Sequence, residues 1–375
     1  MIPVFLPTHG EREAQAVAEV LRSGWLGRGP KTEAFETAFA RHIGAEREQV
    51  LSLTSCTEGL FHAVAALGLG PGDEVALPSI SFVGAANAVA ASGAKPVFCD
   101  VERRSLNPGL AEIEAAVTPR TKAVLLMHYG GVPREIAAIA DFCRQREIKL
   151  IEDAANSVAA TQHGRACGTF GDVGVWSFDA MKTLSTGEGG MIWCRDGEIR
   201  QRILLNTTMG LSSFSAIESK KTRNWWEFEV GGFGRRSILG DVAAALGLVQ
   251  LERLPDFVRR RREVHLFYEE ALADLDWLAL PPAPPKGAGS GHAFFWIQCA
   301  EGLRDALALY LRQRGVYTTF RYEPLHGKPV YRSAAELPET DFAARNTLLL
   351  PQHQGLTDQN LETIAALVRE FSCRS

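Results

Sequence analysis

The chain has 375 residues, of which 46% are hydrophobic, and its formal net charge is −4 at neutral pH. This length predicts one large compact domain together with a smaller one. The charge balance and the lack of a long basic run exclude an ordinary nucleic-acid-binding protein. Four consecutive arginines at 259–262 fit the solvated face of a helix better than a polyanion site.

No stretch approaches the roughly 18 apolar residues that span a membrane. The N-terminus has neither the basic start nor the long apolar core of a secretion signal. Seven cysteines stand singly, without the paired spacing of a zinc site or a disulfide framework. We therefore expect a cytoplasmic protein with no metal site and no contact with membranes.

Residues 70–195 alternate short apolar runs with helical patterns such as 134–146. Because the runs are apolar on both faces, they predict the buried strands of a mainly parallel sheet covered by helices. The expected strands lie at 51–53, 74–78, 96–100, 123–128, 148–152, 173–178 and 190–194.

From Asp241 a long helical pattern runs to about Leu272, with a break or kink expected near Pro255. A loop rich in proline and glycine follows at 281–287. A smaller α+β pattern completes the chain, with strand-like segments at 292–299 and 316–322 and a helical segment at 303–314. Its last helix is expected at 358–371, with Thr357 as the N-cap. These patterns predict a large domain over residues 1–250 and a small domain over residues 251–375.

Sheets of this kind bind ligands just beyond the carboxyl ends of their strands. Asp153 directly follows one apolar run, and Lys182 lies shortly after another, in a stretch rich in glycine. A pyridoxal-phosphate site requires a lysine that attacks the aldehyde and an acid that keeps the pyridine nitrogen protonated. The alternative is that Asp153 caps a helix and Lys182 lies on the surface.

Two further segments fit such a site. Ser55, Cys56 and Thr57 open a predicted helix, whose free N–H groups and dipole can hold a phosphate, although a plain helix start has the same pattern. Phe82 follows another strand, where it could stack on a cofactor ring or serve as an ordinary core residue.

Nearly the whole chain resembles the DegT/DnrJ/StrS sugar aminotransferases, which depend on pyridoxal phosphate. The resemblance rests on short motifs that follow one another in the family's order. They lie at 23–26, 69–75, 78–83, 118–123, 128–130, 151–155, 177–190, 324–326 and 350–357. It implies the fold-type I α/β architecture, a mainly parallel central sheet with helices on both faces and a smaller α+β C-terminal domain.

The resemblance also implies roles for individual residues. Lys182 would carry the cofactor as a Schiff base and later shuttle a proton. Asp153 would pair with the pyridine nitrogen, and Phe82 would stack on the ring. The remaining cofactor contacts would be Cys56, Thr57 and Ser177 at the phosphate, and Asn156, in place of the family's usual glutamine, near the phenolic oxygen.

Three positions depart from the family's pattern. Cys56 replaces the usual glycine of the phosphate turn. Arg236 lies at or near an asparagine that often reaches the partner subunit's phosphate, and it could bind that phosphate or a negatively charged substrate. The unusual pair Trp225 and Trp226 either shapes the substrate pocket at a dimer interface or packs within that interface. The expected substrate contacts are His326 and Tyr322.

The resemblance implies transfer of an amino group from L-glutamate to a keto-sugar, in most members nucleotide-linked, with the cofactor alternating between pyridoxal and pyridoxamine phosphate. The site would be shared by two subunits of a homodimer. A cyclitol or another sugar-like carbonyl is the alternative acceptor, and a purely regulatory cofactor-binding role also stays open.

Two other enzyme classes fit less well. Related pyridoxamine-dependent dehydratases replace the lysine with histidine, and this chain keeps Lys182. A nicotinamide-dependent reductase needs a glycine-rich turn directly after the first strand, whereas Gly68, Gly70 and Gly72 follow a predicted helix.

Overall fold

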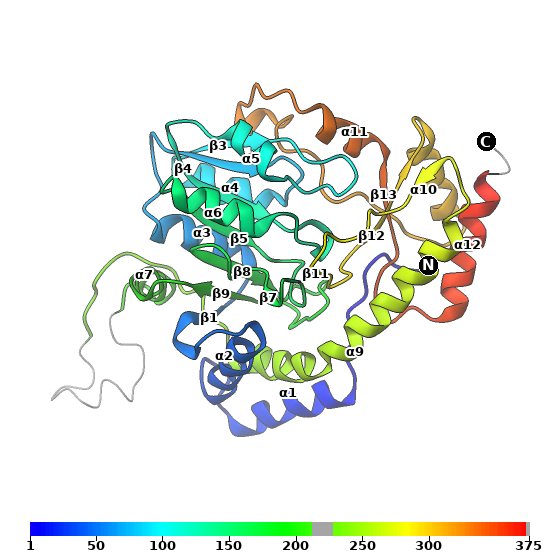
Figure 1. Ribbon diagram of the computed structural model, residues 1–375. Coiled ribbons are helices and arrows are strands. Elements are labelled where there is room, and N and C mark those ends of the chain that lie inside the picture. The colour runs from blue at the N-terminus through cyan, green and yellow to red at the C-terminus, as the bar shows by residue number, and fades with distance from the viewer. Residues whose placement is uncertain (212–227, 373–375) are drawn as a thin grey trace.

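A computed structural model describes residues 1–211 and 228–372 (Figure 1). Its centre is a seven-stranded sheet. The strands are β1 (Val50–Leu53), β2 (Glu74–Pro78), β3 (Lys95–Cys99), β4 (Thr121–Met127), β5 (Lys149–Asp153), β8 (Val173–Ser177) and β9 (Gly190–Cys194). Their spatial order is β1-β9-β8-β5-β4-β2-β3, and only β9 runs antiparallel to its neighbours. The mainly parallel sheet expected from the sequence is therefore confirmed.

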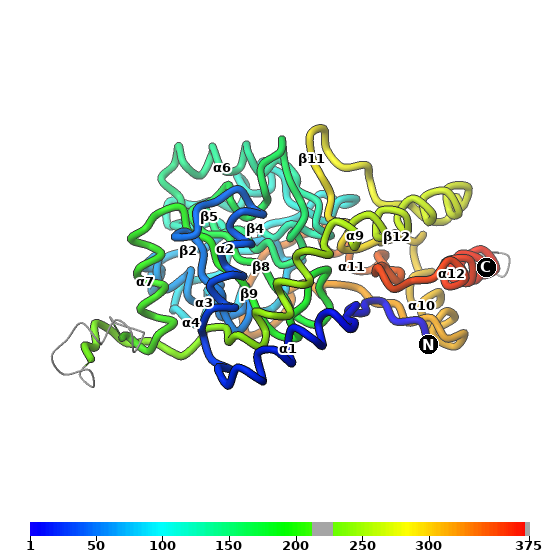
Figure 2. The backbone as a smooth tube through the Cα atoms, turned by 90° about the horizontal axis from the view of Figure 1, so that it is seen from below, coloured from blue at the N-terminus to red at the C-terminus, as the bar shows by residue number. Residues whose placement is uncertain are grey.

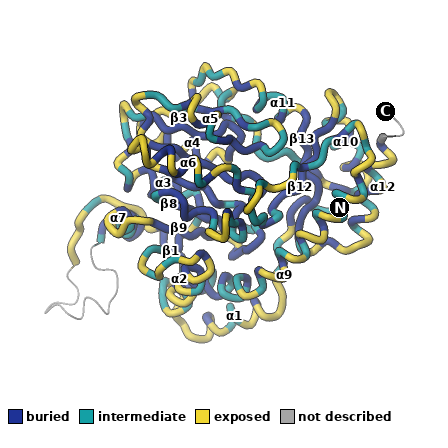
Figure 3. Tube along the Cα trace, in the orientation of Figure 1, coloured by how far each residue is buried: buried dark blue, intermediate teal, exposed yellow. Residues whose placement is uncertain are grey.

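Helices cover both faces of this sheet, so that the strands are buried and the outer sides of the helices are exposed (Figure 3). One face carries α3 (Cys56–Ala66), α4 (Val83–Ala91) and α7 (Gly197–Thr207). The other face carries α5 (Leu110–Ala116) and α6 (Ile136–Gln145), with α2 (Pro30–Ile43) packed over the β1 end.

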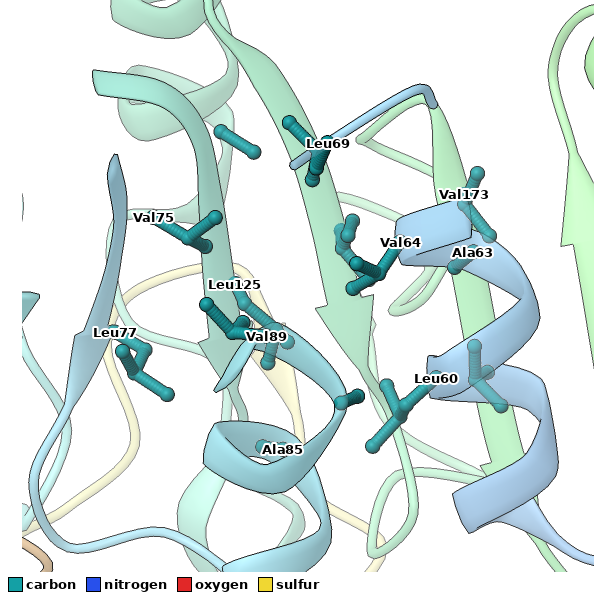
Figure 4. Close-up of a cluster of buried hydrophobic side chains, with 14 of the residues drawn as sticks. Leu60, Ala63, Val64, Leu69, Val75, Leu77, Ala85, Val89, Leu125 and Val173 are labelled. Atoms are coloured by element: carbon teal, nitrogen blue, oxygen red, sulfur yellow. The ribbon is translucent and has the colours of Figure 1, made fainter. Parts of the chain in front are cut away.

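The alternation of side chains along each strand explains why the apolar runs are continuous. In β4, Leu125 faces the core beneath α3 and α4, whereas Val124 faces the core beneath α5 and α6. Figure 4 shows Leu60 and Val64 of α3 and Val89 of α4 in the first of these cores. Both faces of a strand with helices on both sides are covered, so apolar side chains predominate on both.

A second core forms around a three-stranded sheet in the C-terminal part of the chain. Its strands are β10 (Leu278–Ala279), β12 (Phe295–Cys299) and β13 (Thr347–Leu350), and its helices are α10 (Leu303–Gln313) and α12 (Asp358–Ser372). Ile2 pairs with Val316, which brings the N-terminus to this core, as Figure 2 shows. The expected strand-like element at 316–322 contributes only isolated bridge residues.

The long helix α9 (Asp241–Leu272) joins the two cores. It is continuous through Pro255 and its two halves run in different directions, so of the expected break or kink the structure has the kink (Figure 1). The boundary predicted at residue 250 lies within this helix. Thr357 caps α12 as expected, because its hydroxyl accepts a hydrogen bond from the Asn360 amide at 3.2 Å.

The arginines at 259–262 do not all lie on a solvated face of α9. Arg261 points inward and is 1% exposed. It donates to the carbonyl oxygens of Ala293 and Gln352 at 3.2 and 3.0 Å. A guanidinium with five donors can therefore join α9 to the C-terminal core without a carboxylate partner.

The remaining elements are short or peripheral. They are α1 (Glu11–Ser23), α11 (Pro338–Asn346), β6 (Thr161–Gln162), β7 (Arg165–Ala166), β11 (Ala288–Gly289), η1 (Arg47–Gln49), η2 (Tyr129–Gly131) and η3 (Pro329–Tyr331). Within the described ranges, none of the helices is long and apolar enough to cross a bilayer.

Candidate active site

A cavity of about 390 Å³ lies at the carboxyl ends of β5 and β8. Parallel strands bring their ends to the same edge of the sheet, which explains why residues distant in sequence meet there. The cavity brings together seven of the ten residues that were expected to contact cofactor or substrate: Cys56, Thr57, Phe82, Asp153, Ser177, Lys182 and Tyr322.

Asp153 ends β5 and is 2% exposed. Its Oδ1 accepts a hydrogen bond from the Ala155 amide at 3.0 Å and lies 4.0 Å from Cys56 Sγ. Burial raises the pKa of the Asp153 carboxyl, while the Ala155 amide and the charges of Lys182 and His128 act in the opposite direction. Residues 154–160 form turns, so Asp153 caps no helix and that alternative is wrong.

Lys182 lies in the loop that follows β8, and its side chain is partly buried rather than on the open surface. Its Nζ donates to Asn156 Oδ1 at 2.9 Å. Asn156 is itself buried, and its Nδ2 has no acceptor among the described residues. The oxygen of the Asn156 side chain therefore orients Lys182, and the Nδ2 of the same side chain is left as a free donor.

The start of α3 forms another wall of the cavity. Ser55 caps the helix by accepting a hydrogen bond from the Glu58 amide at 3.1 Å, while the amides of Cys56 and Thr57 have no partner within the helix. Cys56 has no positive φ, so this position needs no glycine. A Cβ at Gly190 would lie 2.7 Å from the Cys56 nitrogen, so here glycine allows β9 to approach the helix start.

Phe82 lies immediately before α4 and is 45% exposed. Its ring meets that of Tyr322 edge-on, with 5.8 Å between the centroids and an interplanar angle of 60°. An ordinary core residue would be buried, so the reading of Phe82 as core is wrong. The two rings line the same cavity and offer a flat apolar surface to a ligand.

The sequence profile of the DegT/DnrJ/EryC1/StrS aminotransferase family matches residues 7–369. The chain belongs to this family. It is 51% identical over 366 residues to the dTDP-4-dehydro-2,3,6-trideoxy-D-glucose 4-aminotransferase of Saccharopolyspora spinosa, covering 97% of this chain and 95% of that protein. It is also 35% identical to the spore coat polysaccharide biosynthesis protein SpsC of Bacillus subtilis, covering 99% and 97% of the two chains.

Solved structures agree with this assignment. The aminotransferase TlmJ from Streptoalloteichus hindustanus superposes with a TM-score of 0.96 at 53% identity, covering all of both chains. The sugar aminotransferase CalS13 from Micromonospora echinospora gives a TM-score of 0.88 at 27% identity, covering 99% of this chain and 100% of that one. The expected fold-type I architecture is confirmed, and the chain is a keto-sugar aminotransferase.

Three residues expected at the site of this family member, His326, Arg236 and Asn156, lie outside the cavity. His326 is held by Ser79, whose hydroxyl accepts from the amides of Leu325 and His326 and so must donate its own proton to His326 Nδ1 at 2.7 Å. Arg236 is exposed, and its backbone pairs with Thr208. Asn156 borders a neighbouring small space that it shares with Lys182.

Several cavity residues were not anticipated from the sequence. Arg321, Met181, Asp179 and Glu188 all line the wall. Arg321 directly precedes Tyr322, which was predicted, and the other three flank or closely follow Lys182. In the sequence, only their proximity to predicted residues pointed to these four positions. Proximity along the chain does not show which way a side chain points.

Two further histidines, His128 and His353, are buried and hydrogen-bonded and do not line the cavity. His128 Nε2 lies 3.0 Å from Glu152 Oε2, and both side chains are almost fully buried. His353 bonds to the Pro3 carbonyl at 3.2 Å and lies away from the cavity. The Trp225–Trp226 pair lies outside the described residues.

Proposed function

We propose that this aminotransferase moves an amino group from L-glutamate to a nucleotide-linked keto-sugar, with pyridoxal phosphate as its cofactor. The meeting of the Lys182 amine, the buried Asp153 carboxyl and the open N-terminus of α3 in one cavity carries this proposal. The Saccharopolyspora spinosa relative is named for a dTDP-linked 4-keto-sugar, which supports an acceptor of that class here.

The chain's own groups fit this cofactor. The free amides of Cys56 and Thr57, at the positive end of the α3 dipole, suit a phosphate, and Ser177 lies beside them. No hydrogen bond from a described residue reaches Asp153 Oδ2, so this oxygen is available to a ring N–H. Asn156 Nδ2 is a buried donor without an acceptor, which suits a phenolic oxygen.

When bound, pyridoxal phosphate supplies an electron-poor ring that accepts the electron pair left by a departing proton. Lys182 Nζ would remove that proton from the α-carbon of the donor and deliver it to the carbon that carried the cofactor's aldehyde; in the second half of the cycle it would move a proton from that carbon to the sugar carbon. Asn156 Oδ1 keeps the amine oriented between these steps. Because Asp153 is shielded from water, its charge acts strongly on the ring nitrogen.

We infer that two copies of the chain share their sites. Phe228, Val230 and Phe233 are 67%, 61% and 100% exposed, which is unusual for neighbouring large apolar side chains on a monomer. They lie three to eight residues before Arg236, whose exposed guanidinium would then reach the phosphate in the partner's cavity. Multi-angle light scattering of the wild type and of Phe233→Asp tests this, since a dimer that the substitution does not weaken would contradict it.

The decisive experiment is an absorbance titration of the purified protein with pyridoxal phosphate, for the wild type and for Lys182→Ala. A shifted cofactor band that needs Lys182, and that disappears on addition of glutamate, is expected. A wild-type spectrum identical to that of Lys182→Ala would overturn the proposal. A band that glutamate leaves unchanged would reject glutamate as the donor and preserve the cofactor assignment.

The identity of the acceptor is tested in the same system. Glutamate-treated protein should regain its original band when a nucleotide-linked 4-keto-sugar is added. Recovery with an inosose-type cyclitol, and none with the keto-sugar, would favour the alternative acceptor. Loss of a hydroxyl from the sugar without transfer of nitrogen would identify dehydration instead.

A further inference from the structure

Arg321 is a cation on the cavity wall that no other group of the described chain neutralises. It lies between α10 and η3, next to Tyr322, and its side chain is only partly buried. The nearby cation Lys328 is paired, since it bonds to Glu323. Arg321 has no carboxylate partner among the described residues.

The contacts that Arg321 makes hold its guanidinium in place but do not neutralise its charge. Its plane lies over the ring of Phe5, with 4.7 Å from Cζ to the ring centroid. Its Nη2 lies 2.9 Å from the sulfur of Met181, which is a weak acceptor. Stacking on an aromatic ring uses the face of the guanidinium and leaves its N–H edges available, and two parallel N–H groups match a carboxylate.

The position of Arg321 relative to Lys182 selects the kind of anion. Met181, which contacts Arg321, immediately precedes Lys182, and all three residues line the same cavity. Consecutive Cα atoms lie about 3.8 Å apart, so the guanidinium is anchored close to the residue that removes the proton. The α-carboxylate of an amino acid is one bond from the carbon that loses its proton. It therefore fits this position better than the diphosphate of a nucleotide-linked sugar, which lies on the far side of the sugar ring.

The other charges on the cavity wall favour the same position. Asp179 and Glu188 also line the cavity, and their carboxylates repel a substrate carboxylate. Asp153 and the N-terminus of α3 are engaged by the cofactor in the proposed function. Lys182 is engaged by the cofactor and by proton transfer in the proposed function, so Arg321 is the remaining cation of the described wall that can receive an acidic substrate.

We propose that Arg321 binds the α-carboxylate of the amino-acid donor, and of the keto acid that leaves, by a bidentate ion pair. The inference rests on the proposed function. It makes Arg321 the residue that admits an α-amino acid in one half of the cycle and is not required for the keto-sugar in the other half.

The test uses the cofactor-loaded protein and three variants: Arg321→Gln, Arg321→Lys and, as a matched control, Arg314→Gln. Arg314 also stacks on an aromatic ring, that of Tyr310 at 3.7 Å, but does not line the cavity. Single-turnover absorbance changes give the apparent affinity for glutamate and for the nucleotide-linked keto-sugar separately. Calorimetric titration with 2-oxoglutarate gives a binding constant that does not depend on turnover.

For Arg321→Gln, the apparent Kd for glutamate and the Kd for 2-oxoglutarate should both rise about 10- to 100-fold, the loss expected for a charged hydrogen-bonded pair. The apparent Kd for the keto-sugar should change less than about threefold. Arg321→Lys should recover part of the affinity for glutamate, and Arg314→Gln should match the wild type.

Two results overturn the assignment. Weaker keto-sugar binding with unchanged glutamate binding would mean that Arg321 meets the phosphates of the acceptor. Unchanged binding of both would mean that Arg321 only packs against Phe5. A wild type without a Lys182-dependent band would refute the proposed function instead, and the 2-oxoglutarate titration would still report on Arg321.

Discussion

Replacing Glu36 with glutamine should lower the free energy of unfolding by about 3 kcal/mol. Glu36 lies on α2 and is fully buried. Its Oε1 accepts from Arg28 Nη1 at 2.6 Å and from the Ser52 amide and hydroxyl at 2.8 and 2.7 Å. Its Oε2 accepts from Arg28 Nη2 at 2.8 Å and also from Arg47.

The magnitude follows from what glutamine can replace. Its oxygen can keep the bonds to Ser52 and to one N–H of Arg28, but its NH₂ group would face the two remaining guanidinium donors. Charge-assisted hydrogen bonds contribute about 1.5–3 kcal/mol each, and two are lost. Arg28 and Arg47 are 18% and 26% exposed, so they can turn toward water, which keeps the loss near the lower end of the range for a broken buried pair.

Thermal unfolding at pH 7 measures this effect. An unfolding entropy of about 2.1 cal/mol/K per residue gives about 0.8 kcal/mol/K for a chain of 375 residues, so Tm should fall by about 4 °C. The matched control is Glu252→Gln, which breaks an ion pair with Arg12 whose side chains are 63% and 60% exposed. This change should lower Tm by less than about 1 °C.

The pH dependence of the stability difference between wild type and Glu36→Gln tests this explanation. Burial alone would raise the pKa of Glu36, but the hydrogen bonds and charges of Arg28 and Arg47 more than offset it and leave the pKa lowered. A carboxyl with a lowered folded pKa stabilises the fold above its unfolded pKa and loses that contribution as the pH falls through the folded value. The difference between wild type and variant should therefore be full at pH 7 and shrink below about pH 4. A difference that is constant from pH 7 to pH 3, or a Tm change no larger than in the control, would refute the reasoning.

Three further predictions follow from local structure. Thr357→Ala removes the α12 cap and should lower stability by about 1 kcal/mol, measured by urea unfolding, whereas Thr357→Ser should not. Asp153→Asn keeps an acceptor for the Ala155 amide but loses the charge, so kcat should fall about 10²- to 10³-fold while the Lys182-dependent band persists; an unchanged kcat would remove Asp153 from the mechanism. Burial raises the pKa of the Cys56 thiol, so Cys56 should resist iodoacetamide at pH 8 in the native protein and react once urea unfolds it, as peptide mass mapping can establish.

Much of the large domain could be predicted because its signals are local. A strand buried on both faces needs an apolar residue at nearly every position, so β2 and β9 could be read directly from runs that have no polar face. The cap of α12 was equally readable, because Thr357 and the helix start that it serves are neighbours in the chain. The expected strand at 316–322 failed because strand pairing depends on a distant partner, which the sequence of one segment does not contain.

The sequence by itself also determined which chemical groups are available and where they stand relative to the strands. An acid at the end of β5, a lysine after β8 and small residues at the start of α3 are properties of single segments. Their match to a known family then predicted their roles, because the order of the motifs along the chain is itself sequence information.

Only the tertiary structure decided which groups meet and which way they point. Cys56 and Asp153 are 97 residues apart, yet parallel strand order brings them to one cavity. Arg261 turned inward from a run of arginines that looked solvated, and Arg321, which no motif distinguished, turned toward the cavity. The direction of a long side chain is set by the space and the hydrogen-bond partners that other elements provide, so it cannot be read from the residues beside it.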